Sequence, residues 1–284
     1  MSIHIITDSA SDIVDDLEGV EVVPMTIAFG DKSYRDGVDL SHQRFYEMLI
    51  ESNALPVTSQ VTVYEWGKAF SSACEQGDEV VCVTLSSKLS GTYQSALLAA
   101  EECVGKVHVV DSLNAAVGER VLVELALRRA NEGKSAQEIV AELERRRSDV
   151  KLIALLDTLE YLKRGGRIDA LSAGVGSLLH VKPVVTVRNG EVVLLGKARG
   201  SKNGRNLLNE HVEAAGGIDI SLPFTLGYTG LSRKLLDKYV QDSRAHWQAY
   251  TQDPSDLPTH SIGATIGTHV GPGAVALAFF GANE

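Results

Sequence analysis

The sequence predicts an α/β fold of two domains: an N-terminal domain built on a parallel sheet, and a second α/β domain built on a mixed or antiparallel sheet. Short apolar runs alternate with helical patterns as far as Asp149, an order typical of a parallel sheet covered by helices on both faces. Further on, Asn189-Gly190 stands between β-branched runs and predicts a two-residue hairpin, which joins antiparallel strands. We therefore expect one domain over residues 1–149 and another over residues 150–284.

In the first half, four apolar runs predict strands at residues 4–8, 20–29, 79–85 and 106–111. Pro24 is expected to bend the second of these strands or to place it near an edge, because proline cannot donate to a sheet ladder. Thr62 and Glu65 have the spacing of a capping box, which predicts a helix start. Helices are expected at 41–52, 62–76, in the Ala/Leu-rich stretch that ends at 100, at 114–131 and at 136–147, with a polar loop at 56–60.

The second half is expected to begin with a strand at 150–156, followed by the basic segment 163–167 and a small-residue segment up to His180. The hairpin covers 183–195. The remaining elements are a helix at 203–215, a strand at 224–229, a helix at 232–247, and strands near 262–267 and 274–280.

Composition points away from nucleic acid and from anionic lipid surfaces. The formal net charge is −10, whereas proteins that bind phosphate backbones or anionic membranes carry excess Lys and Arg. The chain has three cysteines, an odd number, and no two of them have C-x-x-C spacing. A disulfide framework is therefore not expected, which favours a reducing compartment. The N-terminus turns acidic too early for a signal peptide, and no apolar run approaches the roughly 18 residues of a membrane span. We therefore expect a cytoplasmic protein with no integral membrane segment.

The stretch from Leu85 to Ala100 is the centre of the candidate site. An apolar run ends at Leu85, and hydroxyls and glycine then precede a helix, with Ser86, Ser87, Ser90, Gly91 and Thr92 in between. Hydroxyls and free backbone N–H groups at a helix start favour an anion. These residues leave open whether the anion is a phosphate, a nucleotide or a carboxylate, and a helix cap with redundant hydroxyls is the plainer alternative.

Several familiar catalytic patterns fail on inspection. Gly133-Lys134-Ser135 lacks the earlier glycine of a P-loop and is better explained as a helix stop followed by a capping box. The stretch 271–276 has dinucleotide-type glycine spacing, but the chain ends before the acidic residue that such a site needs. The eight histidines have no metal-binding spacing, so neither a metal nor another cofactor is expected.

Three further polar segments complete the candidate set: Thr58-Ser59-Gln60, the basic segment that ends at Arg167, and His269 in a glycine-rich stretch. Each has a structural alternative, namely a helix entry, a solvated loop and a tight turn between two strands. Together they supply hydroxyls, an imidazole and cations, but no obvious nucleophile–base pair. That inventory binds an anion better than it performs chemistry on one.

Taken in chain order, these segments resemble the DegV family. The similarity covers essentially the whole chain and rests on residues 6–12, 58–60, 86–96, 111–112, 159–168, 182–183 and 269–273. The resemblance implies two α/β domains with a long-chain fatty acid buried between them. It also implies a binding protein without catalytic residues, which presents the fatty acid carboxylate to a separate fatty acid kinase catalytic subunit for acyl-phosphate formation.

The same resemblance implies roles for individual residues. Thr58, Ser59 and Ser90, beside Gly91, would hold the carboxylate, through a network that reaches His269 and is supported by Arg167. Many relatives have proline where this chain has Val61, so the stiffness of the Thr58 loop is in question. An enzyme that transfers a phosphoryl or acyl group itself, and a regulatory module whose ligand only alters partner affinity, are the alternatives.

Overall fold

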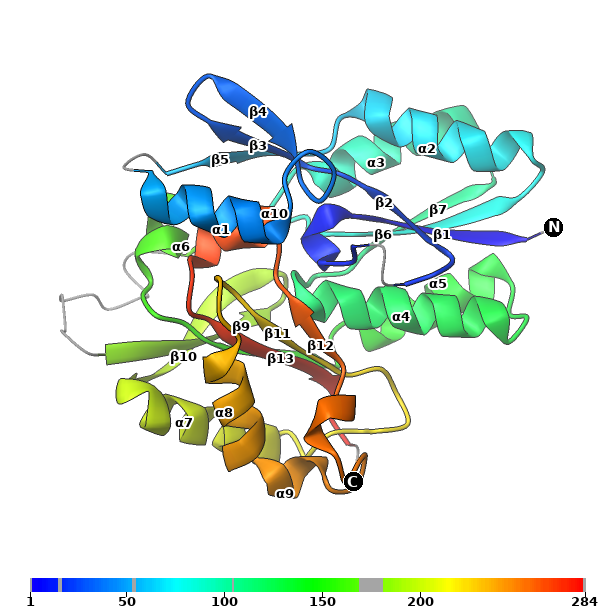
Figure 1. Ribbon diagram of the computed structural model, residues 1–284. Coiled ribbons are helices and arrows are strands. Elements are labelled where there is room, and N and C mark those ends of the chain that lie inside the picture. Colours follow the sequence, from blue (N-terminus) through cyan, green and yellow to red (C-terminus); the bar gives the residue numbers. More distant parts are fainter. Residues whose placement is uncertain (1, 15–16, 53–54, 104, 169–180, 283–284) are drawn as a thin grey trace.

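The computed structural model describes residues 2–14, 17–52, 55–103, 105–168 and 181–282. Within these ranges the strands form sheets of four, six and three strands (Figure 1). The small-residue segment that ends at His180 lies outside the described residues from position 169 onward.

The four-stranded sheet confirms the parallel sheet predicted for the N-terminal half. Its order is β2-β1-β6-β7, and every neighbouring pair is parallel. Helices α2 and α3 cover one face, and α4 and α5 cover the other (Figure 1). The strands are β1 (Ile3–Asp8), β2 (Val20–Val23), β6 (Glu79–Thr84) and β7 (Val107–Asp111). The helices are α2 (Val63–Glu75), α3 (Thr92–Ala100), α4 (Val117–Asn131) and α5 (Ala136–Arg146).

The six-stranded sheet is mixed, as predicted for the second domain. Its order is β10-β9-β8-β13-β11-β12, and only the β11–β12 pair is parallel. The strands are β8 (Val150–Leu155), β9 (Val181–Arg188), β10 (Glu191–Arg199), β11 (Thr225–Tyr228), β12 (Thr259–Ser261) and β13 (Val275–Phe280). Helices α7 (Gly200–Ala214), α8 (Lys234–Asp242) and α9 (Arg244–Trp247) lie on its outer side (Figure 1). The helix expected at 232–247 is thus divided in two.

The predicted hairpin is confirmed between β9 and β10. Asn189 and Gly190 both have positive φ, of 51° and 86°, which is the conformation that a type I′ turn requires. The turn is fixed against the first sheet, because Ser86 Oγ donates a hydrogen bond to the Gly190 carbonyl at 2.8 Å. Helix α4 packs on strands of both large sheets, so one cluster of buried apolar residues spans the two halves.

The strand expected over 20–29 is wrong as a single element. It is divided at Pro24 into β2 and β3 (Thr26–Phe29), which belong to different sheets. β3 is the centre of the three-stranded antiparallel sheet, between β4 (Lys32–Arg35) and β5 (Val57–Ser59). The polar loop expected at 56–60 therefore contains a short strand, which forms only because β3 lies beside it.

The strand expected near 262–267 is also wrong. Residues Ala264–Val270 form helix α10, and the strand of this region, β12, ends at Ser261. The helix begins because Asp36 accepts hydrogen bonds from the backbone N–H groups of Ala264 (3.1 Å) and Thr265 (2.8 Å). His269 therefore lies in the last turn of a helix, not in a turn between two strands. Helices α1 (His42–Glu51) and α6 (Glu160–Arg164) pack beside α10.

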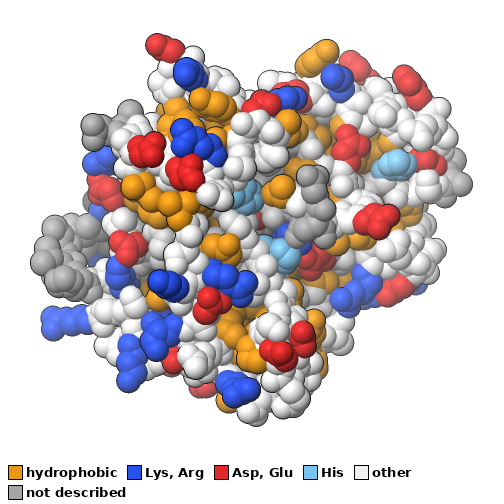
Figure 2. All heavy atoms as spheres, in the orientation of Figure 1, with side chains coloured by type: hydrophobic (Ala, Val, Ile, Leu, Met, Phe, Trp, Pro, Cys, Tyr) orange, Lys and Arg blue, Asp and Glu red, His pale blue; other side chains and the backbone are white. Residues whose placement is uncertain are grey.

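Charged side chains are unevenly spread over the face shown in Figure 2. Lys and Arg gather at the lower left, over α7 and β10, whereas both signs alternate over the upper half. Within the described ranges, no helix combines the length and apolar character of a membrane span. The described residues also contain no cluster of three or more His, Cys, Asp or Glu placed to hold a metal ion.

Candidate functional site

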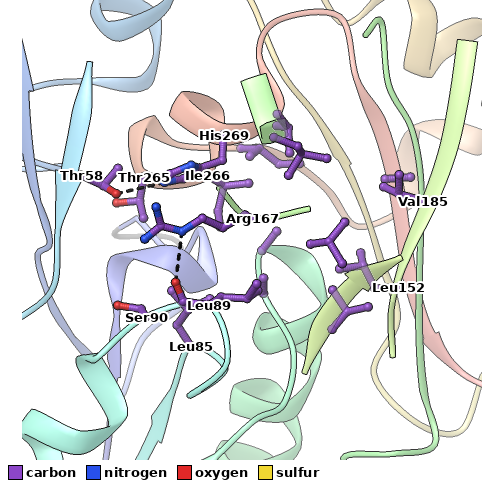
Figure 3. Close-up of a pocket in the computed structure, with 18 of the residues that line it drawn as sticks. Thr58, Leu85, Leu89, Ser90, Leu152, Arg167, Val185, Thr265, Ile266 and His269 are labelled. Atoms are coloured by element: carbon purple, nitrogen blue, oxygen red, sulfur yellow. Dashed lines mark hydrogen bonds between the residues drawn. The ribbon is translucent and has the colours of Figure 1, made fainter. Parts of the chain in front are cut away.

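A cavity of about 400 Å³ lies between the two large sheets, where α6, α10 and the segment after β6 face β8 and β9. One end is apolar and is formed by side chains such as Leu152, Ala154, Val185, Val192 and Ala276. The other end is polar and includes Thr58, Gln60, Ser90, Arg167 and His269. Figure 3 shows this polarity, with the oxygen and nitrogen atoms of Thr58, Arg167 and Ser90 at one side and Leu152 and Val185 at the other.

Strand alternation produces the apolar wall. Successive side chains of a strand point to opposite faces of a sheet, and in β8 Leu152 and Ala154 line this cavity while Lys151 and Ile153 do not. Helix α10 closes the cavity from the other side with Thr265, Ile266 and His269. The apolar wall thus belongs largely to strands of the core, whereas the polar end combines β5, the last turn of α10, and loop residues such as Ser90 and Arg167.

His269 and Thr58 are joined across 211 sequence positions. Thr58 Oγ1 and His269 Nε2 are 3.0 Å apart, a hydrogen-bond distance (Figure 3). Burial, with a smaller contribution from the positive charge of Arg167, lowers the pKa of His269 from 6.5 to about 4. The imidazole is therefore neutral at pH 7.

The contacts of the ring also assign its tautomer. Nδ1 is buried and has no hydrogen-bond partner among the described residues. A buried N–H group without a partner is rarer than a buried lone pair without one. We therefore place the proton on Nε2, which donates to Thr58 Oγ1. The hydroxyl proton of Thr58 then points to another acceptor, and the cavity is where such an acceptor would lie.

The segment after β6 contributes the second hydroxyl. Ser90 Oγ accepts a hydrogen bond from Thr92 N at 3.2 Å and lies 2.9 Å from Thr92 Oγ1. Gly91 precedes α3 and carries no side-chain cap for that helix. A Cβ at position 91 would overlap the side-chain amide of Gln60. Glycine at this position therefore lets Gln60 lie across the segment at the edge of the cavity.

Arg167 connects the turn after α6 to the same segment. Its Nε donates to the Leu89 carbonyl at 3.2 Å, and its Nη1 donates to the Gly165 carbonyl at 2.6 Å. Gly165 itself lies against the His269 ring, and a Cβ there would overlap Nδ1. The guanidinium thus supplies a fixed positive charge beside a neutral imidazole.

The loop that contains Thr58 is held by packing where many relatives have proline. Val61 is fully buried among apolar side chains of α2 and α3. Its carbonyl accepts a hydrogen bond from Ser95 Oγ at 2.6 Å. The stiffness that a proline ring would supply is therefore replaced by a buried side chain and a hydrogen bond.

The Asp8–Asp12 segment supports the site from behind. Asp8 caps the short helical turn Ser9–Ser11, and its Oδ2 accepts from Leu85 N at 2.8 Å. Burial raises the pKa of Asp8 to about 6. Asp12 accepts from Gly263 N at 2.8 Å, just before α10 begins. The acidic residues therefore fix the two segments that present Ser90 and His269.

All six residues expected at the site line the cavity: Thr58, Ser59, Ser90, Gly91, Arg167 and His269. Ser59 is the most peripheral, because its side chain is exposed. Sequence reasoning missed Thr265 and the apolar wall. Thr265 was hidden because its segment was expected to form a strand, and the wall comes from strands whose apolar residues also suit an ordinary core.

Comparison with known proteins places the chain in a family. The family model described as "Uncharacterised protein, DegV family" matches residues 2–282. A DegV domain-containing protein of Deinococcus radiodurans is 37% identical over 287 residues, covering 98% of each chain. Another, from Caldanaerobacter subterraneus, is 34% identical over 281 residues, again covering 98% of each.

Solved structures agree with the family model. A DegV family protein from Thermus thermophilus, described by its fatty acid binding, is 35% identical, with a TM-score of 0.87 over 99% of this chain and 100% of that one. A DegV lipid binding protein from Thermotoga maritima is 27% identical, with a TM-score of 0.85 over 98% of each chain. The matches extend over both halves of the molecule and over every segment of the site, and the chain therefore belongs to the DegV family.

Proposed function

We propose that the protein binds a long-chain fatty acid and presents its carboxylate to a separate fatty acid kinase subunit. The observation that carries the proposal is the polarity of the cavity, which is apolar at its inner end and has hydroxyl, imidazole and guanidinium groups at the other. The fatty acid binding described for the T. thermophilus relative supports the same ligand class.

The acyl chain supplies the driving force. Burying about 14 methylenes at about 0.8 kcal/mol each gives a gross gain of roughly 11 kcal/mol before the costs of ordering the ligand. Only the carboxylate opposes burial, because a buried charge without partners is expensive. The polar end must therefore supply hydrogen bonds and an opposite charge.

The polar end has the groups that a carboxylate needs. Thr58 is left with a free hydroxyl proton by the His269 bond, and Ser90 can donate once Thr92 donates to it. Ser59 and the backbone at Gly91 lie at the same end. Arg167 supplies the compensating positive charge, so we assign the carboxylate to these six residues.

Presentation to a kinase follows from where this end lies. Ser59 and Gln60 are exposed while Leu152 and Ala276 are buried, so the carboxylate is at the solvent side and the tail is inside. We place the protein in the cytoplasm, where ATP-dependent activation takes place. No membrane insertion is needed for this role, because the bound acyl chain is shielded by the protein.

The alternative, that the protein is an enzyme that transfers a phosphoryl or acyl group by itself, gains no support from the described cavity residues. They include no carboxylate, lysine or cysteine side chain, and the single imidazole is held by Thr58. With ATP, the protein alone is expected to leave the fatty acid unchanged. Acyl-phosphate formation should require an added fatty acid kinase subunit.

Removing the two hydroxyls tests the assignment. Thr58→Val combined with Ser90→Ala should raise the Kd for oleate at least tenfold, since a charge-assisted hydrogen bond contributes about 1.5 kcal/mol or more. Binding is measured by calorimetry on delipidated protein. Ser33→Ala combined with Ser87→Ala is the matched control, because both serines are exposed and neither lines the cavity. An unchanged Kd in the Thr58/Ser90 variant would overturn the site.

A further inference from the structure

A second cavity, of about 330 Å³, lies at the junction of the two halves of the molecule. It is formed by the segment after β7, the end of α5, strands β8 and β9, and the end of α7. Its volume is within the range of small-molecule sites, which starts near 300 Å³. None of the residues assigned to the fatty acid carboxylate lines it.

The two cavities adjoin each other along strands β8 and β9, and Thr186 and Val187 line both of them. In β8, Leu152 and Ala154 face the fatty acid cavity, whereas Lys151 and Ile153 face the second one. In β9, Val185 faces the first cavity and Arg188 the second. From Lys151 to Ala154, strand β8 thus follows the alternation expected of a β-strand. The residues of these two strands that line only the first cavity are therefore apolar, whereas the cations Lys151 and Arg188 line only the second.

The charge of the second cavity is opposite to that of the whole chain. Arg147, Lys151 and Arg188 line it, and its described lining contains no Asp or Glu, although the net charge of the chain is −10. Glu191 lies opposite Arg188 in the hairpin register but is not part of the lining. Three cations without a lining carboxylate leave the cavity electropositive.

Helix ends reduce this potential without reversing it. The cavity lies at the C-terminal ends of α5 and α7, and each helix end contributes about −0.5 of an elementary charge. Part of the hydrogen-bonding capacity of the Arg147 guanidinium is already used, because its Nη1 donates to the Asp111 carbonyl at 2.8 Å. Three full positive charges still exceed the two partial negative ones by about two.

Further polar groups complete the cavity. His211 Nε2 is buried and has no hydrogen-bond partner among the described residues, and His211 lines the cavity. A buried polar atom without a protein partner calls for an explanation, and a bound ligand that supplies the missing hydrogen bond is one of the usual ones. Ser148 adds an exposed hydroxyl to the lining.

We propose that this second cavity is a binding site for a phosphate-bearing anion. A phosphate monoester carries nearly two negative charges and several acceptor oxygens at neutral pH, which matches two uncompensated cations and additional hydrogen-bond donors. Arg147 and Arg188 contact the phosphate oxygens with their planar N–H groups, Lys151 adds a point charge, and His211 Nε2 donates. The phosphate belongs to a small soluble molecule or to the headgroup of a phosphatidic acid-type lipid.

Calorimetry with pyrophosphate and with glycerol 3-phosphate, at low ionic strength on the full chain, tests the site. We expect saturable binding with one ligand per chain. Lys151→Met combined with Arg188→Gln should raise the Kd at least tenfold, and higher salt should raise it in the wild type because ions screen partly exposed charges. Circular dichroism and an unchanged Kd for oleate would show that the variant is folded and the first cavity intact.

The matched control is Lys32→Met combined with Arg145→Gln, which removes the same two charges from exposed positions outside the cavity. It should bind pyrophosphate like the wild type. Co-sedimentation with phosphatidic acid vesicles, compared with phosphatidylcholine vesicles, separates the two sources. If the wild type binds the phosphatidic acid vesicles but not the soluble phosphates, and the Lys151→Met/Arg188→Gln variant loses this binding, the site is assigned to a lipid headgroup.

Two results would overturn the proposal. One is that the wild type binds neither the soluble phosphates nor phosphatidic acid vesicles. The other is that the control variant loses as much affinity as the cavity variant, which would reduce the effect to overall charge. Neither result would contradict the assignment of the fatty acid cavity, because that assignment is tested separately with oleate.

Discussion

His269 is the residue whose environment gives the site its pH dependence. Its pKa is about 4 in the folded protein, against 6.5 for an unperturbed histidine. The unfolded chain therefore binds more protons than the folded one between these two values. By linkage, the contribution of His269 to stability is complete above pH 6.5 and is lost as the pH falls through about 4.

A His269→Gln variant isolates this contribution. Between pH 7 and pH 4, the wild type should lose about 3 kcal/mol of unfolding free energy relative to the variant, from a pKa shift of about 2.5 at 1.36 kcal/mol per unit. Urea unfolding at several pH values measures the difference. Buried carboxyls such as Asp8, whose raised pKa acts in the opposite direction, are present in both proteins and cancel. Parallel pH curves for the two proteins would show that His269 is not a buried neutral ring.

Gly165 has a role that its sequence position does not disclose. The residue is followed by another glycine and would pass as part of a turn, yet its missing Cβ makes room for His269 Nδ1. Gly165→Ala should displace the imidazole, weaken the bond to Thr58 and raise the Kd for oleate about tenfold, as small misplacements of binding groups are costly.

Gly67→Ala is the control for this substitution. Gly67 lies inside α2, where a Cβ would meet nothing within 4 Å, and alanine favours helix over glycine by about 1 kcal/mol. This variant should keep its affinity for oleate and gain stability. Equal affinities for the Gly165 and Gly67 variants would contradict the placement of the imidazole.

Among the elements, helix α10 is the one that sequence reasoning placed wrongly. Its seven residues have too little local signal, and its start is fixed by Asp36 and Asp12, which are remote in sequence. The pairing of β3 with β5 was not predicted for the same reason, because β5 is too short to be recognised without its partner strand. In contrast, the capping box at Thr62 and the Asn189-Gly190 turn depend on neighbours only, and both are confirmed.

Asp36→Ala tests whether α10 is held from outside. The variant loses two hydrogen bonds to buried backbone N–H groups, and we expect a loss of about 2 kcal/mol in stability together with weaker oleate binding. Asp39→Ala is the comparison, since that carboxylate is exposed and pairs with Arg35 at 2.9 Å. It should cost less than about 1 kcal/mol. Similar losses in both variants would argue against the capping role.

At the scale of the whole molecule, pattern reasoning succeeded where the physics is repetitive. The alternation of strands and helices was sufficient to predict the parallel sheet of the first half. The hairpin signal was sufficient to predict that the second half has a mixed sheet. The division at residue 149 stays a proposal, because α4 packs on both sheets. The cavity could not be predicted from residue patterns, since Leu152 and Ala276 look like ordinary core residues until the fold leaves space between them. The segments that hold the six site positions were recognised from their residue types as an anion-binding set, whereas the choice of a carboxylate and the role of each residue came only from the family resemblance.

The central claim is that the cavity holds a long acyl chain, and lipid extraction tests it most directly. The protein is purified without detergent from a bacterial host, extracted with organic solvent, and the extract is examined by mass spectrometry, with the Thr58→Val/Ser90→Ala variant prepared in parallel. We predict about one long-chain fatty acid per wild-type chain and a much lower amount in the variant. Wild-type protein with no acyl chain at any stoichiometry, and no uptake of added oleate, would contradict the claim.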